Sequence, residues 1–499
     1  MVCGLLAAVA FCNAVAIGER YEPATITVQQ LVAKSREAAG RLVPGGYHIV
    51  ESAKREDSAL TEDTLELKGD YVTVVRDGPF TSSYGKVHGT KWSANENGVV
   101  AVSPNDDTVA TNPYAVAIDA LRTNTDDATM LGVTSDEPKC YVVELKPRSG
   151  LVERRFYDAK TFLLRRVETS DFRGETTTDY DDYRRAFGRM VPFHSTYIDS
   201  HNIKPIDFRL STFEPAKPDP SVFAIPKSAT VFDLGTASEL AIPADFTRGG
   251  VIVRVTIAGR GLDFYLDSGA STTVINSDVA RELGLTLYNP RKRQFGGEFT
   301  AAKTRVDDFA LGEIHAKHFA LYALPIDFPA GEKRVVGLLG SDFFSSARIR
   351  LSFKEKTLTM QSASVPIPST WTKLPINVDE EVPMTKAAFN GVEGHFIFDT
   401  GAFETMLYPH YFSKFTPKSV GQPVGSVVTV SGHATKYREF TFSRFDLGDL
   451  AFADMLAIVA EGNTIEGVIE DGVIGRSFLS NFDIVFDYPN HTVYLSPQL

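Results

Sequence analysis

The chain has 499 residues, which exceeds the usual size of one domain and predicts two or three domains. Its composition, with 43% hydrophobic and 23% charged residues, is that of a globular protein and argues against large-scale disorder. A formal net charge of −12, without a cluster of lysines and arginines, argues against nucleic acid as a partner.

Residues 2–17 are almost wholly apolar and end in Ala14-Val15-Ala16, a small-x-small cleavage pattern. The run is short for a membrane span, and no later stretch has the apolar length for one. The sequence therefore predicts a signal peptide over residues 1–16 and a mature protein without a transmembrane span. Cleavage would leave Cys140 as the single cysteine, so no internal disulfide could form. An exported protein of this kind fits a bacterial location, periplasmic or extracellular.

Short segments of alternating polarity dominate residues 17–228 and predict one large antiparallel sheet. The expected strands are Glu66–Val75, Tyr141–Leu145, Val152–Tyr157, Leu163–Thr169 and Thr176–Tyr183. One helix or two should accompany the sheet, because four apolar residues recur at helical spacing: Val28, Leu31, Val32 and Ala38. The proline-rich residues 214–220 cannot lie in the interior of a sheet and predict a linker or a sheet edge at the end of this domain.

The end of this domain carries a resemblance. Three segments resemble the curved half-barrel of periplasmic lipoprotein-carrier proteins: RFYDAKTFLLRRVE from Arg155, then DYDDYRRAFGRMVPFHSTY, then FRLSTFEPAKPDPSVFAIP. The resemblance implies a half-barrel-like sheet over residues 17–228, with a concave face suited to a lipid, a lipoprotein or a peptide. A structural or docking role for this domain stays open.

After residue 240 the sequence repeats several landmarks in one order. An apolar stretch runs into Asp267-Ser-Gly-Ala in the first copy and into Asp399-Thr-Gly-Ala in the second. A glycine lies eight residues before each aspartate, and a Leu-Gly pair ends 45 and 49 residues after it. An apolar-apolar-Gly element ends 73 residues after Asp267 in the first copy and 76 residues after Asp399 in the second. The repeat predicts two similar β lobes, residues 240–365 and 370–499, divided by prolines at 366 and 368.

The two aspartates are the strongest candidates for a chemical role. A carboxylate that ends an apolar strand is costly to bury unless hydrogen bonds or a shared proton compensate it. A single Asp-Ser-Gly fits an ordinary turn, but two copies in matched frames favour a paired site. In such a pair, the Gly after each Ser or Thr allows a tight turn close to the carboxylate.

These loops resemble the active-site loops of aspartic peptidases, in particular the retropepsin-like type of bacteria, over about residues 240–499. The resemblance implies a mainly β fold with two pseudo-twofold-related lobes. It further implies an endopeptidase that acts on polypeptides by a water activated between Asp267 and Asp399, without a metal or organic cofactor. The supporting residues that it implies are Ser268, Gly269, Thr400 and Gly401. Four further residues fall where the family places its substrate-covering flaps, although plain hairpin turns fit them equally: Gly296, Gly297, Ser431 and Gly432.

The residue after each Asp-Ser/Thr-Gly-Ala differs between the copies. Ser271 matches the small or polar residue of the family, whereas Phe403 departs from it. We predict that the Ser271 hydroxyl supports Asp267, which would make Asp267 the more ionised partner. Since Phe403 cannot donate a hydrogen bond, an inactive, peptidase-like protein that binds peptides stays open as an alternative. The half-barrel resemblance leaves a second alternative open, a periplasmic lipid or lipoprotein carrier that acts through the N-terminal domain.

Overall fold

The computed structural model describes residues 21–41, 45–55, 58–103, 128–145, 152–171, 174–199, 205–247, 250–294, 298–326, 328–330, 333–378, 382–415, 423–428, 434–460 and 470–497. The predicted signal peptide, residues 1–16, lies outside these ranges. Within them, no helix has the length and apolar character needed to cross a membrane. The fold is mainly β, which confirms the predicted class.

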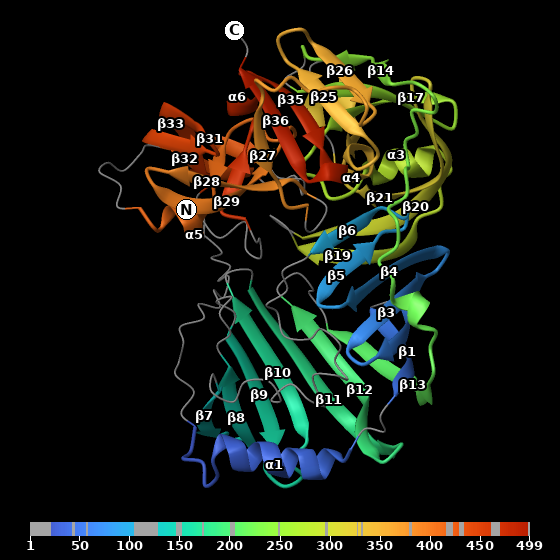
Figure 1. Cartoon of the computed structure of the whole chain (residues 1–499), viewed down its shortest axis with the longest axis vertical. Coiled ribbons are helices and arrows are strands. Elements are labelled where there is room, and N and C mark those ends of the chain that lie inside the picture. The colour runs from blue at the N-terminus through green and yellow to red at the C-terminus, as the bar shows by residue number, and fades with distance from the viewer. Residues whose placement is uncertain are drawn as a thin grey trace, which may run out of the picture.

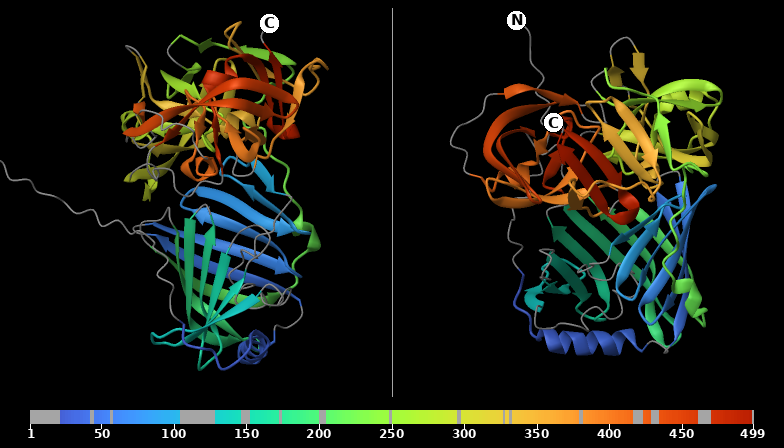
Figure 2. Two further views of the ribbon diagram at one scale, coloured as in Figure 1. Left: turned by 90° about the vertical axis from the view of Figure 1, so that its left-hand side faces the viewer. Right: turned by 45° about the horizontal axis from the view of Figure 1, so that its top comes forward.

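The N-terminal half forms one antiparallel sheet of 13 strands (Figure 1). Two meanders meet in its middle, where β1 (Gly46–Arg55) pairs with β13 (Ile206–Ala216). The other strands are β2 (Ser58–Leu67), β3 (Asp70–Asp77), β4 (Phe80–Val87), β5 (Thr90–Ala94), β6 (Val100–Ser103), β7 (Ala128–Val133), β8 (Cys140–Leu145), β9 (Val152–Asp158), β10 (Leu164–Asp171), β11 (Gly174–Ala186) and β12 (Arg189–Asp199). The sheet curves so that its two meanders run across each other (Figure 2), as expected for a half-barrel-like sheet.

Four of the five expected strands coincide with β8 to β11, but the fifth, Glu66–Val75, is wrong. This segment is the β2–β3 hairpin, and the chain reverses at Lys68 and Gly69. Both residues have positive φ, 56° and 95°, which is the conformation of a two-residue type I′ turn.

Helix α1 (Val28–Ala39) packs on one side of the sheet, across the ends of β7 to β12 (Figure 1). It begins with a capping box, in which the Thr27 hydroxyl accepts the Gln30 N–H and the Gln30 side chain accepts the Thr27 N–H. Its buried residues are Val28, Leu31, Val32 and Ala39, so the buried alanine is Ala39 and not the expected Ala38.

The C-terminal half contains two lobes of the same topology. Lobe 1 consists of β15 (Ala244–Asp245), β16 (Ile252–Ile257), β17 (Arg260–Leu266), β18 (Val274–Asn276), β19 (Tyr288–Gln294), β20 (Glu298–Leu311), β21 (Ile314–Leu324) and β24 (Gly337–Leu339). Lobe 2 consists of β28 (Met384–Phe389), β29 (Val392–Phe398), β30 (Met406–Leu407), β31 (Pro423–Val428), β32 (Ala434–Leu447), β33 (Leu450–Ala460) and β34 (Gly472–Ile474). A β16–β20 pairing closes the first sheet and a β28–β32 pairing closes the second. The predicted pair of related β lobes is therefore confirmed.

A sheet of six strands joins the lobes. Its order is β14 (Glu239–Ile242), β26 (Thr357–Gln361), β25 (Arg348–Ser352), β35 (Phe482–Asp487), β36 (Thr492–Pro497) and β27 (Thr372–Pro375). In its central ladder, Ile349 of β25 lies opposite Phe486 of β35. One buried apolar cluster continues through both lobes, with the rings of Phe344 and Phe486 5.2 Å apart. The lobes thus share a core, and Figure 2 shows them side by side above the N-terminal sheet. The domain limits given by the sequence stay predictions.

Candidate active site

Asp267 and Asp399 occupy equivalent positions at the ends of buried strands. Asp267 follows β17, and its backbone N–H donates to the Leu339 carbonyl at 3.0 Å. Asp399 follows β29, and its N–H donates to the Ile474 carbonyl at 3.1 Å. Both acceptors belong to the apolar-apolar-Gly elements of the repeat, β24 and β34, which pair in parallel with β17 and β29. Each repeat therefore fixes its own aspartate on a rigid strand pair.

The hydroxyl residues after the two aspartates tie the lobes together. The Ser268 hydroxyl donates to the Phe398 carbonyl at 2.6 Å and accepts the Thr400 N–H at 3.0 Å. Reciprocally, the Thr400 hydroxyl donates to the Leu266 carbonyl at 2.8 Å and accepts the Ser268 N–H at 3.0 Å. Both side chains are essentially fully buried. Because each hydroxyl bridges to the other lobe, the relative position of the two aspartate loops is set by four crossed hydrogen bonds.

The glycines bring each loop against the opposite carboxyl group. A Cβ atom built on Gly269 would lie 2.6 Å from Asp399 Cγ, and one built on Gly401 would lie 2.5 Å from Asp267 Cγ. Only glycine fits at such a distance. The Gly269 N–H donates to Asp267 Oδ1 at 3.0 Å, and Asp399 Oδ1 accepts the N–H groups of Gly401 and Ala402 at 2.8 and 2.9 Å. The structure thus brings Asp267, Asp399 and their four predicted supporting residues together.

The electrostatics of the pair favour one shared proton. Burial raises the pKa of Asp267 well above its usual range, and the adjacent Asp399 charge raises it further. Burial also raises the pKa of Asp399, but the N–H groups of Ala402 and Gly401 and the charge of Arg476 oppose that rise. The N–H groups of Gly269 and Ala270 oppose the rise at Asp267 in the same way, so both pKa values are raised and the pair titrates as a unit. The expected order, with Asp267 as the more ionised partner, stays a prediction, and the charge of Arg476 beside Asp399 argues against it.

Ser271 does not act as the sequence suggested. Its side chain is exposed, and among the described residues its hydroxyl makes no hydrogen bond to Asp267. Instead, its backbone carbonyl accepts a hydrogen bond of 2.5 Å from the Ser341 hydroxyl. Ser271 therefore supports the loop through its backbone.

Two threonines that the sequence analysis missed brace the loops from behind. Thr273 and Thr405 each follow their aspartate by six residues, and their hydroxyls accept the N–H groups of Gly340 and Gly475 at 3.3 and 3.2 Å. The backbone N–H of Thr273 donates to the Asp342 carboxylate, and that of Thr405 donates to the Ser477 hydroxyl, both at 3.1 Å. The equal offset of the two threonines in the repeat was a signal that could have identified them.

Phe403 and Arg476 form a second pair that the sequence did not reveal. The Phe403 ring is 63% exposed, and the Arg476 guanidinium lies over it, 5.2 Å from the ring centroid. The backbone N–H of Arg476 donates to the Ala402 carbonyl at 3.0 Å. This hydrogen bond holds Arg476 against the Asp399 loop. Phe403 therefore supports a cation beside the two carboxyl groups.

The predicted flap residues Gly296, Gly297, Ser431 and Gly432 lie outside the described residues. The strands that flank them are described: β19 pairs with β20, and β31 pairs with β32. Each lobe thus contains an antiparallel strand pair at the expected position in its sequence. Within the described part of the chain, no group of three or more His, Cys, Asp or Glu side chains could hold a metal ion.

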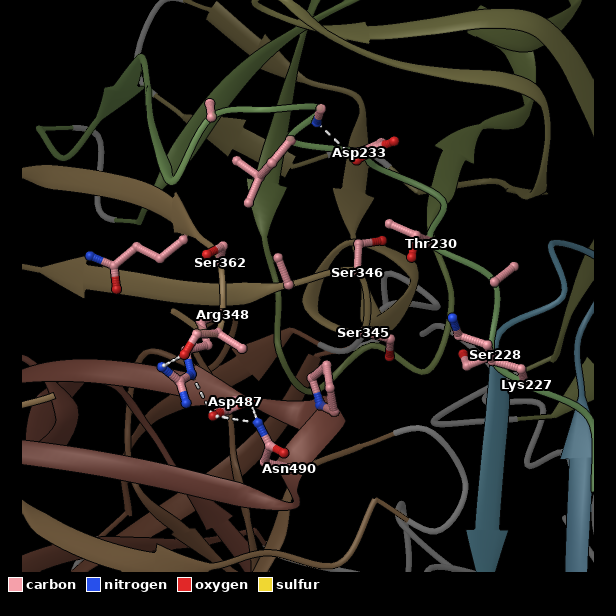
Figure 3. A pocket seen from close by; sticks show the side chains of 18 residues that line it. Lys227, Ser228, Thr230, Asp233, Ser345, Ser346, Arg348, Ser362, Asp487 and Asn490 are labelled. Atoms are coloured by element: carbon pink, nitrogen blue, oxygen red, sulfur yellow. Dashed lines mark hydrogen bonds and ion pairs between the residues drawn. The ribbon is translucent and has the colours of Figure 1, made fainter. Parts of the chain in front are cut away.

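A cavity of about 440 Å³ lies between the linker after β13 and both lobes (Figure 3). Its lining includes Lys227 of the linker, Arg348 of lobe 1 and Asp487 of lobe 2. Arg348 donates to Asp487 at 2.6 Å, and the Asn490 amide donates to both oxygens of the same carboxylate. These groups satisfy one another's hydrogen bonds, and neither Asp267 nor Asp399 lines the cavity. We therefore interpret the cavity as a seam between the linker and the lobes.

Comparison with known proteins gives one family match and two similar solved structures. The sequence profile of the aspartyl protease family matches residues 253–343 and 385–478, which contain one aspartate loop each. Two solved structures are similar to the chain: an aspartic proteinase from Irpex lacteus and a LolA superfamily protein from Nitrosomonas europaea. The first has 15% identity and a TM-score of 0.36 and covers 52% of this chain and 97% of its own. The second has 14% identity and a TM-score of 0.32 and covers 40% of this chain and 98% of its own.

No curated protein is significantly similar to the chain in sequence. The family match falls once in each lobe, at corresponding strands and loops. The C-terminal half of this protein accordingly contains two tandem regions that match the aspartyl protease family, one in each lobe.

Proposed function

We propose that the protein is an aspartic endopeptidase that hydrolyses peptide bonds with Asp267 and Asp399. The observation that carries this proposal is the pair of partly buried carboxyl groups, whose loops are held together by reciprocal hydrogen bonds between the lobes and whose pKa values are both raised. Two close carboxyl groups that cannot both ionise provide an acid and a base at one site. An exported location, resting on apolar residues 2–17, is part of the proposal.

In the proposed reaction the shared proton starts on Asp267, because the charge of Arg476 favours the ionised form of Asp399. The Asp399 carboxylate accepts a proton from a water molecule whose oxygen bonds to the substrate carbonyl carbon, while Asp267 gives its proton to the carbonyl oxygen. In the second step, Asp399 gives its proton to the amide nitrogen and the C–N bond breaks. A hydroxyl of the intermediate returns a proton to Asp267, which restores the starting state. No redox partner or metal is involved in this sequence.

The direct test is digestion of a peptide library from about pH 3 to about pH 8, because the activity of a pair that shares a proton depends on pH. Cleavage by the wild type that is absent in Asp267→Asn supports the proposal. Binding of peptides without cleavage would favour the alternative of an inactive, peptide-binding protein, for which the exposed Phe403 ring offers an apolar contact. Lipid that co-purifies with the chain, detected by mass spectrometry, would favour the carrier alternative.

Removal of the Arg476 charge should change the pH dependence. A nearby cation favours the ionised carboxylate, so Arg476→Gln should raise the pKa values of the pair. Both limbs of the kcat/KM profile are then expected to move to higher pH, by up to about one unit. Arg444→Gln is the matched control, because Arg444 is exposed and pairs with Asp446 at 2.7 Å. Limbs that stay in place or move to lower pH would contradict this role of Arg476.

The two lobes should be inactive when they are made as separate chains divided near Pro366. Each lobe supplies one carboxyl group, and the shared sheet and core would be broken between β25 and β35. We expect no cleavage by residues 240–365 alone at low concentration, measured as initial rates over a dilution series. Activity of that lobe with a rate per molecule independent of concentration would refute the single-chain pair. A second-order dependence would instead indicate two copies associating.

A further inference from the structure

Two hairpins of the N-terminal sheet contact lobe 1. The β3–β4 turn and the segment between β5 and β6 reach the strands β19, β20 and β21, and Figure 1 shows β5 and β6 beside β19. The antiparallel pair of β19 and β20 is here called the lobe 1 hairpin, and the predicted flap residues Gly296 and Gly297 lie between these two strands in the sequence. The N-terminal sheet therefore lies against the base of a segment expected to cover the substrate.

Asp77 is the centre of the first contact. It lies at the end of β3, is 2% exposed, and accepts hydrogen bonds from Arg291 at 2.6 Å and from the Asn289 amide. Lys303 of β20 lies 3.0 Å from the same carboxylate and 2.5 Å from Glu96 of the N-terminal sheet. Both cations are largely buried, with 15% and 11% of their side chains exposed. Burial disfavours the charge of Asp77, but Lys303 and Arg291 lower its pKa below the usual range.

An aromatic contact lies next to this cluster. Phe80, at the start of β4, is 1% exposed and meets Tyr288 of β19 edge to face, with ring centroids 5.6 Å apart. The guanidinium of Arg305 on β20 lies 4.9 Å from the Phe80 ring centroid. The β3–β4 turn thus contacts both strands of the lobe 1 hairpin.

Asn97 forms the second contact. Its side-chain amide donates to the Ala320 carbonyl and its side-chain oxygen accepts the Ala320 N–H, both at 2.8 Å. The same amide donates to Asp342 Oδ1 at 2.9 Å, and Asn95 donates to this oxygen at 3.2 Å. Asp342 is fully buried, and its other oxygen, Oδ2, accepts the Thr273 N–H behind the Asp267 loop. One carboxylate therefore links the N-terminal sheet to that loop.

Lobe 2 provides an internal comparison. Its counterpart of Asp342 is Ser477, whose single hydroxyl oxygen accepts the Thr405 N–H. A serine suffices to brace the loop, so the second oxygen of Asp342 serves the contact with Asn95 and Asn97. Among the described residues, Asp342 Oδ1 thus accepts hydrogen bonds from the N-terminal sheet, while Oδ2 braces the Asp267 loop.

We infer that the N-terminal sheet positions the lobe 1 hairpin and the Asp267 loop for catalysis, with Asp77 and Asn97 as positioning residues. The inference rests on the proposed peptidase function. Loss of the Asp77 charge would leave two largely buried cations without their common partner, a strongly unfavourable arrangement that the hairpin can relieve by moving away. Loss of the Asn97 amide would remove three hydrogen bonds to lobe 1.

The test compares Asp77→Asn and Asn97→Ala with the wild type in the full chain. Amide hydrogen exchange should become at least about tenfold faster in β19 and β20 and stay unchanged in β31 and β32. KM for a peptide substrate should rise more than kcat falls, with kcat/KM reduced about tenfold or more. Asp179→Asn is the matched control, since Asp179 pairs with Arg166 at 2.7 Å within the N-terminal sheet. It should leave both readouts unchanged.

The two failures are distinguishable. If the wild type cleaves no peptide, the proposed function fails, while hydrogen exchange in β19 and β20 still decides whether the sheet holds the hairpin. If the wild type cleaves and both variants keep its exchange rates and its KM, the positioning role is refuted. Asn97→Ala removes no charge, so it provides a folded variant should Asp77→Asn unfold.

Discussion

Replacement of either Asp267 or Asp399 by asparagine is expected to abolish peptide hydrolysis and leave the fold intact. Asparagine keeps the shape of the side chain but can neither accept the proton of the water nor return one to the leaving nitrogen. Residues that act as a unit lose most of the rate when one is removed, so kcat should fall by about four orders of magnitude. The measurement is initial cleavage rate for both variants, with exposed Asp278→Asn as control.

The stability of these two variants has a definite sign. A carboxyl group whose pKa is raised in the folded state makes the protein less stable as pH rises above its unfolded pKa of about 3.9. Asparagine has no charge to bury, so at neutral pH the variants should unfold at the same temperature as the wild type or at a higher one. Turnover close to the wild-type rate in either variant would show that the pair is not catalytic.

The second large effect is expected for Gly401→Ala. The added Cβ would lie 2.5 Å from both Cγ and Oδ2 of Asp267, much closer than two such atoms can approach. The two loops must separate, which should lower kcat by about a hundredfold or more and the free energy of unfolding by about 1–3 kcal/mol. The measurements are single-turnover cleavage and denaturant unfolding.

Gly391→Ala serves as the control for this loss of stability. A Cβ on Gly391 meets no atom within 4 Å, but its φ of +80° strains any other residue, by about 1–2 kcal/mol. It should therefore lower stability without lowering kcat. Gly269→Ala should resemble Gly401→Ala, because its Cβ would approach Asp399 in the same way. Full activity of Gly401→Ala would contradict the close approach of the loops.

The sequence was sufficient for the two aspartate loops because each is a local pattern, and the repeat supplied the pairing. It was not sufficient for the cation beside the pair. That cation is Arg476, which follows Asp399 by 77 residues and reaches it through the parallel pairing of β29 and β34. The role of Ser271 was misjudged for the same reason, since only the fold decides which way a hydroxyl after a turn points.

The contacts between domains were also beyond prediction from sequence. Asn97 and Asp342 are 245 residues apart, and neither belongs to a periodic pattern. The β2–β3 hairpin was missed because lysine occupies the first position of its turn, where a type I′ turn usually has asparagine or another residue that tolerates positive φ. Local patterns thus predicted the strands and the pair of aspartates, and long-range packing determined the rest.

The central ladder of the N-terminal sheet has a consequence for biosynthesis. Its hairpins join neighbours along the chain, but β1 pairs with β13, for example Ser52 with Arg209, which are 157 residues apart. A chain synthesised from its N-terminus therefore exposes one edge of β1 until β13 has emerged. Such distant pairing slows folding, and an open strand edge invites aggregation. Protection of the nascent chain by chaperones should matter most before residue 216 has been added.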